Sequence, residues 1–266
     1  MKPVLCFTHA TGFPGGSYQT LFHLLEPHFE IIAVPQLGHD PRFPVDANWR
    51  SLVDELLGFI KERADHPVIA VGHSLGAMVS YMAAAHEPER FRALVMLDPP
   101  VINGPQAMFF GLAKWLGLAD RFTPAGRTLG RRETWPDVDT AREYFRSKPL
   151  FSNFTRECLE DYLAAGLKPD AQGVRLSFDP AVEIRMFRHT PHNSWKYRRR
   201  LRVPTALLTG EVSRVIRPDA IKRLVGTHGM LHRQVPGGHM FPLEHPAETA
   251  SMIRSVLSDL QAMEHK

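Results

Sequence analysis

The chain has 266 residues, the length of one large domain or of a core domain that carries an insertion. Its hydrophobic content of 44% and charged content of 23% are ordinary for a globular enzyme and exclude a disordered chain. The formal net charge of +4 includes one dense basic cluster: Lys196, Arg198, Arg199, Arg200 and Arg202. We interpret this cluster as a solvated loop rather than an anion or nucleic-acid patch, because no stripe of interleaved aromatic residues accompanies it.

Cysteine usage and hydropathy bear on localisation. The two cysteines, Cys6 and Cys158, are far apart in the sequence and are expected to be free thiols in a reducing compartment. The first apolar run is too short for a signal peptide, and no stretch has the length of a membrane span. We therefore expect a cytoplasmic protein without a membrane span.

Six short apolar runs alternate with helical patterns, beginning with a run that ends at a loop rich in glycine and proline. The runs are residues 4–8, 31–34, 68–71, 93–97, 205–209 and 231–235, and the helical patterns are residues 49–60, 75–85, 218–225 and 247–260. Apolar strands that alternate with helices predict a parallel sheet buried on both faces. The expected fold class is α/β, with a mostly parallel, doubly wound sheet of about six strands.

The middle of the chain lacks this alternation and is expected to be an inserted, mainly helical cap. The predicted boundaries are 1–100 and 202–266 for the core and 101–201 for the cap. A dense apolar cluster lies in the cap: Phe109, Phe110, Trp115, Leu116, Leu118 and Phe122. These residues would either line an acyl or aromatic pocket or pack the cap against the core, and packing explains most of them.

One motif carries a nucleophile. The sequence Gly72-His73-Ser74-Leu75-Gly76 directly follows the third apolar run and directly precedes a helix. The G-x-S-x-G spacing places a serine on a strained strand-to-helix turn, where the glycines permit close backbone approach. The bland alternative, a strand-to-helix turn with a capping serine, does not explain the full pattern. Ser74 is therefore the candidate nucleophile.

A serine hydroxyl needs an adjacent base, and His239 has the required position. It follows Gly237 and Gly238 directly after the last predicted strand, so it should lie at the sheet edge where Ser74 emerges. At the same edge, His9 ends the first strand and precedes a loop that should supply a backbone N–H to an oxyanion. We interpret His9 itself as a buried residue that supports this loop, rather than as a catalytic group.

These motifs together resemble the α/β-hydrolase family over nearly the whole chain. The resemblance rests on the loop 9–12, residues 36–40, 72–76, 95–99 and 208–211, and Gly238-His239. It implies a serine hydrolase of the esterase-like branch, with the backbone N–H groups of Thr11 and Leu75 as the oxyanion hole. A serine nucleophile argues against the epoxide-hydrolase and haloalkane-dehalogenase branches, which use aspartate at that position.

Two departures from the family pattern concern the first strand. Ala10 replaces the usual glycine of the loop, a small change that still permits close approach. The first apolar run resembles the strand that is third in the family, so the usual N-terminal hairpin is expected to be absent from the sheet. The exposed sheet edge would permit pairing with a second copy, and a homodimer is a further expectation.

The third departure concerns the triad acid. Relatives usually place it in a Gly-Glu-x-Asp pattern after the penultimate strand, but here that segment is Gly210-Glu211-Val212-Ser213. Asp98, at the end of the fourth strand, is the favoured substitute, because a strand end beside the nucleophile strand can reach His239. Glu211 is the alternative acid, and a dyad without an acid is the third possibility.

The expected activity is hydrolysis of an ester or related acyl bond in a small, largely apolar substrate through an acyl-enzyme. Thioester, lactone, amide and carbon–carbon bonds use the same residues and stay open. No metal-ligand spacing and no dinucleotide loop occur, so no metal or other cofactor and no nucleic acid are expected. The rival interpretation, motivated by Ser213, is a catalytically weak or inactive member that acts as a small-molecule receptor.

Overall fold

Six strands form one sheet in the computed structural model, which describes residues 2–197 and 200–264. Every pairing in this sheet is parallel, and the strand order is β2-β1-β3-β4-β8-β9. The strands are β1 (Val4–Thr8), β2 (Glu30–Ala33), β3 (Val68–His73), β4 (Phe91–Leu97), β8 (Thr205–Gly210) and β9 (Leu231–Val235). This sheet confirms the predicted α/β fold, and each strand lies close to its predicted bounds.

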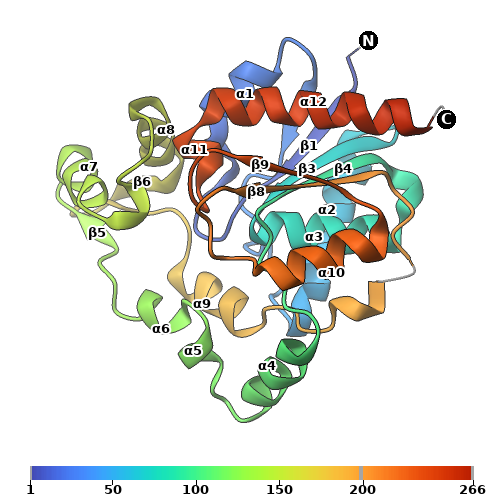
Figure 1. Ribbon diagram of the computed structural model, residues 1–266. Helices are drawn as coiled ribbons and strands as arrows, with labels where there is room; N and C mark the ends of the chain where they lie inside the picture. The colour runs from blue at the N-terminus through green and yellow to red at the C-terminus, as the bar shows by residue number, and fades with distance from the viewer. Residues whose placement is uncertain (1, 198–199, 265–266) are drawn as a thin grey trace.

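Helices cover both faces of the sheet (Figure 1). One face packs against α2 (Arg50–Arg63), α3 (Leu75–His86) and α10 (Pro218–His228), and the other against α1 (Gln19–Leu25), α11 (Phe241–Glu244) and α12 (Pro246–Glu264). Alternation along β1 shows why: Cys6 joins the first core, whereas Leu5 and Phe7 join the second. The four central strands, β1, β3, β4 and β8, are largely apolar on both sides because both sides are covered.

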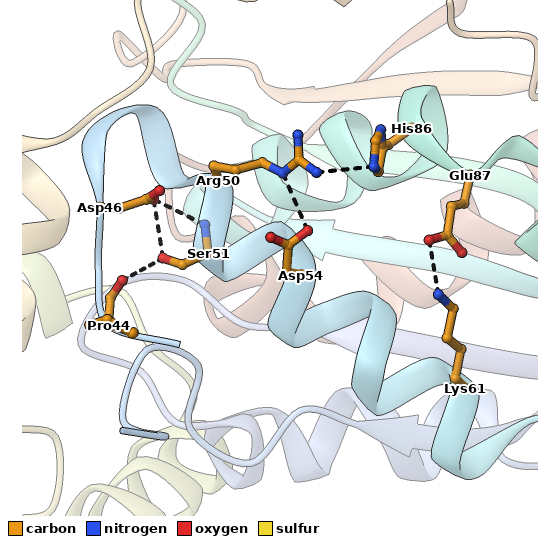
Figure 2. Close-up of polar contacts among 8 residues, drawn as sticks. All are labelled: Pro44, Asp46, Arg50, Ser51, Asp54, Lys61, His86 and Glu87. Carbon is orange, nitrogen blue, oxygen red and sulfur yellow. Dashed lines mark hydrogen bonds and ion pairs between the residues drawn. The ribbon is translucent and has the colours of Figure 1, made fainter. Parts of the chain in front are cut away.

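Polar contacts on the surface link α2 to α3 (Figure 2). The Arg50 guanidinium lies 3.1 Å from Nε2 of His86 and also pairs with Asp54. Near the other end of α2, Lys61 lies 2.9 Å from Glu87. Exposed pairs of this kind contribute about 1 kcal/mol or less each, so the buried leucines of α2 hold the helix in place.

Between β4 and β8 the chain leaves the sheet and forms a separate group of elements. The helices are α4 (Pro105–Trp115), α5 (Ala119–Phe122), α6 (Ala125–Thr128), α7 (Val138–Arg146), α8 (Arg156–Gly166) and α9 (Pro180–Arg188). A small antiparallel sheet of order β5-β7-β6 joins them, with β5 (Thr134–Trp135), β6 (Leu167–Asp170) and β7 (Gly173–Leu176). These short strands were not predicted from the sequence, because each has only two to four residues and none forms a continuous apolar run.

This inserted segment packs over the carboxyl ends of the strands. Phe13, in the loop after β1, contacts Phe151 and Tyr162, with ring centroids 5.7 and 5.0 Å apart. On the other side, the Trp49 indole donates a hydrogen bond of 2.8 Å to the Met186 carbonyl of α9. Both contacts join residues far apart in sequence, so they fix the insertion against the sheet edge where Ser74 lies.

The structure also bears on the cysteines, the sheet edge, the basic cluster and the membrane span considered from the sequence. Cys6 and Cys158 are both buried and free, and β2 is an edge strand. Arg198 and Arg199 of the basic cluster lie outside the described residues. Within residues 2–197 and 200–264, no helix is both long and apolar enough to span a bilayer.

Candidate active site

Ser74 lies on the tight turn between β3 and α3. Its φ of 54° is in the left-handed region, which is strained for a residue with a side chain. A Cβ on Gly72 would lie 2.5 Å from the Gly76 backbone, and a Cβ on Gly76 would lie 2.0 Å from the Thr8 carbonyl oxygen. Both glycines of the motif are therefore required, because the turn packs directly against the end of β1.

His239 lies on the loop after β9, and its imidazole reaches the serine. The distance from His239 Nε2 to Ser74 Oγ is 3.0 Å. Glu244 of α11 fixes this loop, because its carboxylate accepts a 2.6 Å hydrogen bond from the Gly238 amide. The structure thus brings together the two residues predicted as nucleophile and base.

Asp98 occupies the third position. It follows β4 with a φ of 45°, its side chain is fully buried, and its Oδ2 lies 2.6 Å from Nδ1 of His239. Ser213 donates a hydrogen bond of 2.5 Å to the same carboxylate oxygen. Ser213 stands at the position where the family resemblance predicted an aspartate, and its hydroxyl binds the carboxylate of Asp98 after β4.

The alternative acid lies elsewhere. Glu211 follows β8 with its side chain exposed to solvent, and its backbone N–H bonds to the Val235 carbonyl. The Nδ1 atom that a triad acid would contact is occupied by Asp98. Of the two carboxylates considered from the sequence, the structure brings only Asp98 to the imidazole.

The two predicted oxyanion residues lie in different segments, Leu75 directly after Ser74 and Thr11 in the loop after β1. Leu75 is the first residue of α3, and N–H groups in the first turn of a helix have no acceptor within the helix. Thr11 is half-buried in the loop after β1, the strand end against which Gly76 packs. The strand end that leads into the Thr11 loop therefore lies against the turn that carries Ser74.

His9 supports that loop through both ring nitrogens. Its Nδ1 donates to the Ala10 carbonyl and its Nε2 accepts from the Leu37 amide, each at 2.8 Å. Burial lowers the pKa of His9 to about 4, which favours the neutral ring that this pattern requires. These contacts agree with the interpretation of His9 as a supporting residue.

A buried chain of hydrogen bonds, not foreseen from the sequence, joins the loop after β1 to the loop of His239. The Ala10 amide donates to Tyr18 Oη at 3.3 Å, and that hydroxyl donates to His73 Nδ1 at 2.7 Å. His73 Nε2 then donates to the His239 carbonyl at 2.9 Å. Burial, followed by the neighbouring His239, keeps the pKa of His73 well below its usual value, so one neutral tautomer satisfies every contact.

A second unforeseen group lies where the insertion meets the loop after β1. Glu183 of α9 is buried, and Arg131 binds both of its carboxylate oxygens, at 3.0 and 2.5 Å. A Cβ on Gly12, the residue after Thr11, would lie 3.3 Å from Glu183. Burial raises the pKa of Glu183, and the arginine opposes that rise. Neither residue has a sequence motif, since the contact depends on how the insertion folds back.

The site contains no metal-binding constellation. Among the residues that the structure describes, no group of three or more His, Cys, Asp and Glu side chains could hold a metal ion. The polar groups around Ser74 instead form a serine, imidazole and carboxylate in series. Such a series can activate a hydroxyl for attack on a carbonyl carbon.

The parallel sheet, the strained turn at Ser74 and the histidine loop after the last strand define an α/β-hydrolase architecture. The chain belongs to the Alpha/beta hydrolase family, whose model matches residues 4–252. The family resemblance inferred from the sequence is thereby confirmed.

Curated relatives are hydrolases of several kinds. The type I acyl-CoA thioesterase of Penicillium roqueforti is 25% identical over 198 residues, which make up 66% of this chain and 44% of that protein. Lipase LipV of Mycobacterium tuberculosis is 34% identical over 134 residues, 49% of this chain and 51% of that protein. The chain therefore spans about half the length of these two relatives.

A third relative matches over most of the length of both chains. The 2-(acetamidomethylene)succinate hydrolase of Mesorhizobium japonicum is 25% identical over 226 residues, 83% of this chain and 75% of that protein. A crystal structure of E-2-(acetamidomethylene)succinate hydrolase superposes with a TM-score of 0.78 at 24% identity, covering 97% of this chain and 92% of that one. At this identity the superposition shows the shared fold.

Proposed function

We propose that the protein is a serine hydrolase that cleaves an ester or related acyl bond of a small, largely apolar substrate. Ser74 is the nucleophile, His239 the general base and Asp98 the acid that orients it. The observation that carries this proposal is the unbroken series of two hydrogen bonds, 3.0 Å from serine to imidazole and 2.6 Å from imidazole to carboxylate.

The proposed reaction has two halves. His239 Nε2 accepts the Ser74 proton as Oγ attacks the carbonyl carbon, and the resulting imidazolium protonates the leaving group as the acyl-enzyme forms. Water, deprotonated by the same nitrogen, then attacks the acyl-enzyme and releases the acid. Asp98 accepts the Nδ1–H hydrogen bond throughout, which keeps Nε2 free to accept a proton.

The backbone N–H groups of Leu75 and Thr11 are proposed to stabilise the oxyanion. Two features support this assignment: the Leu75 amide lies at the start of α3, and the loop of Thr11 is fixed by His9 and Tyr18. Hydrogen-bond donors that are held in place before the reaction stabilise the transition state more, because they need no reorganisation as negative charge develops on the oxygen. Residues 101–201 are proposed to act as a cap over this site, supported by the contact of Glu183 with Gly12.

The substrate is proposed to be a carboxylic ester. A lipase and a thioesterase among the relatives suggest an acyl group on oxygen or sulfur. The proposed steps need no cofactor and involve only groups of this chain. The two buried, free thiols are compatible with a reducing cytoplasm as the site of action.

A series of p-nitrophenyl esters of increasing acyl length tests this proposal. We expect turnover by the wild type that depends on acyl length and falls to background in Ser74→Ala. A Ser80→Ala variant is the matched control. Ser80 is a buried serine of α3, the helix that follows Ser74, and its hydroxyl bonds to Thr8. Absence of turnover, together with saturable binding of the same esters, would instead favour the receptor interpretation.

A further inference from the structure

The helix α4 exposes a continuous apolar face to solvent. Met108 and Trp115 are each 80% exposed, which is unusual for such large apolar side chains. The spacing of the exposed residues follows successive helical turns, so they lie on one side of the helix. We call this set the α4 face: Met108, Phe109, Leu112, Trp115 and Leu116, with Phe122 of α5 packed edge-on against Phe109.

The opposite side of α4 is already buried. Ala107, Phe110 and Ala113 face inward, so apolar side chains cover both the inner and the outer side of the helix, and Lys114 of the inner side bonds to the Thr190 carbonyl. A helix of that kind is normally enclosed on every side. Taking about 200 Å² for each large side chain, the α4 face exposes roughly 750 Å², against about 300–600 Å² for the largest patch on a typical monomer. The α4 face therefore lacks the partner that its composition requires.

The charge around this face indicates the kind of partner. The insertion, residues 101–201, contains seventeen lysines and arginines against eleven acidic residues, while the rest of the chain carries a small acidic excess. Next to the α4 face, Asp120 is already neutralised by Arg188. Arg121 is exposed, and Lys196 lies near His192, which packs against Gly111 of α4. An apolar surface with a cationic border is complementary to an anionic lipid interface.

We propose that the α4 face docks the protein on an anionic lipid surface, with its apolar side chains in the boundary between headgroups and acyl chains. Figure 1 shows α4 at the outer end of the insertion, where no other element lies between it and the bottom of the view. A second copy is the less favourable occupant, because pairing two α4 faces would bring together two insertions of the same positive charge. This proposal does not depend on the catalytic assignment.

Vesicle sedimentation with the full chain tests the docking. We expect binding to vesicles of phosphatidylcholine with phosphatidylglycerol, weaker binding to phosphatidylcholine alone, and release at high salt. The double variant Met108→Ser/Trp115→Ser should bind at least about tenfold more weakly, because it removes the two most exposed apolar side chains. Met263→Ser is the matched control, since Met263 is an exposed methionine on α12 and should be replaceable without effect.

Two further measurements keep the outcomes distinct. Thermal unfolding should show that the double variant is folded, since both side chains point into solvent. Light scattering of the vesicle-free protein should give the same oligomeric state for the wild type and the double variant, because pairing at the β2 edge would not involve the α4 face. Vesicle binding that is absent, or unchanged in the double variant, overturns the proposal. A dimer that the double variant dissociates also overturns it, since the α4 face would then be a contact between copies.

Discussion

Replacement of the buried carboxylate tests the least conventional part of the site. In Asp98→Asn the side-chain shape is kept, but an NH₂ group replaces one oxygen. Among the described residues no side chain or backbone group bonds to Oδ1, so we expect the NH₂ group to lie at the place of Oδ2, where Ser213 and His239 Nδ1 can accept from it. An NH₂ group at that place can only donate, so His239 Nδ1 must present its lone pair to it, and the imidazole loses the tautomer that catalysis needs. Loss of this tautomer costs about 10⁴ in kcat, or about 5.5 kcal/mol in activation free energy.

Ser213 offers a way to move the acid back. Because Ser213 Oγ and His239 Nδ1 contact the same atom of Asp98, a carboxylate at position 213 would begin close to the imidazole. We expect the double variant Asp98→Asn/Ser213→Asp to recover about hundredfold of the lost activity. Glu211→Gln is the matched control and should keep the wild-type rate within about twofold, since its side chain is exposed.

Steady-state hydrolysis of a p-nitrophenyl ester measures these rates, and circular dichroism verifies that each variant is folded. A wild-type rate in Asp98→Asn would refute the assignment of the acid. A large loss in Glu211→Gln would refute it equally, because it would place the acid after β8.

Three further predictions follow from contacts around the site. Tyr18→Phe removes the hydroxyl that orients His73, so kcat should fall about tenfold with little change in KM and in the urea midpoint of unfolding. A lowered unfolding midpoint with unchanged kcat would show that Tyr18 has only a structural role. Because burial lowers the pKa of His9 to about 4, its contribution to the free energy of unfolding should be complete above pH 6.5 and fall as pH drops, with about 2 kcal/mol lost by pH 5. Urea unfolding at several pH values measures this dependence, and His9→Gln should make it less steep. An unchanged dependence in His9→Gln would contradict the view that His9 is buried in its neutral form. Gly76→Ala should abolish folding or activity because its Cβ would lie 2.0 Å from a backbone oxygen, whereas Gly226→Ala, with open space around it, should be neutral; a fully active Gly76→Ala enzyme would show that the turn can relax.

The sheet was predictable because its central strands are buried on both faces. Such strands appear as short, continuous apolar runs between helices, and Val68–His73 is the clearest case. The positions of Ser74 and His239 followed from the same reasoning, since both come directly after strands that end at one edge. Local sequence was therefore sufficient wherever a residue's place depends on the strand that precedes it.

Other features depend on contacts between distant parts of the chain. The choice between Asp98 and Glu211 required the direction of each side chain, which the backbone after β4 and β8 determines. Tyr18 had no motif at all, although it lies between two loops of the site. The expectation that most of the cap's apolar cluster packs against the core was wrong, because Phe109, Trp115, Leu116 and Phe122 are exposed. Apolar residues in a helix predict burial, and only the packed structure shows which side lacks a partner.

Covalent labelling tests the proposed nucleophile most directly. The intact protein is treated with a fluorophosphonate, and the adduct is located by mass spectrometry of its peptides. We expect one adduct, on Ser74, with labelling abolished in Ser74→Ala and greatly slowed in His239→Ala, because the imidazole lies 3.0 Å from the hydroxyl. An unlabelled wild type, or an adduct that persists in Ser74→Ala, would contradict the account.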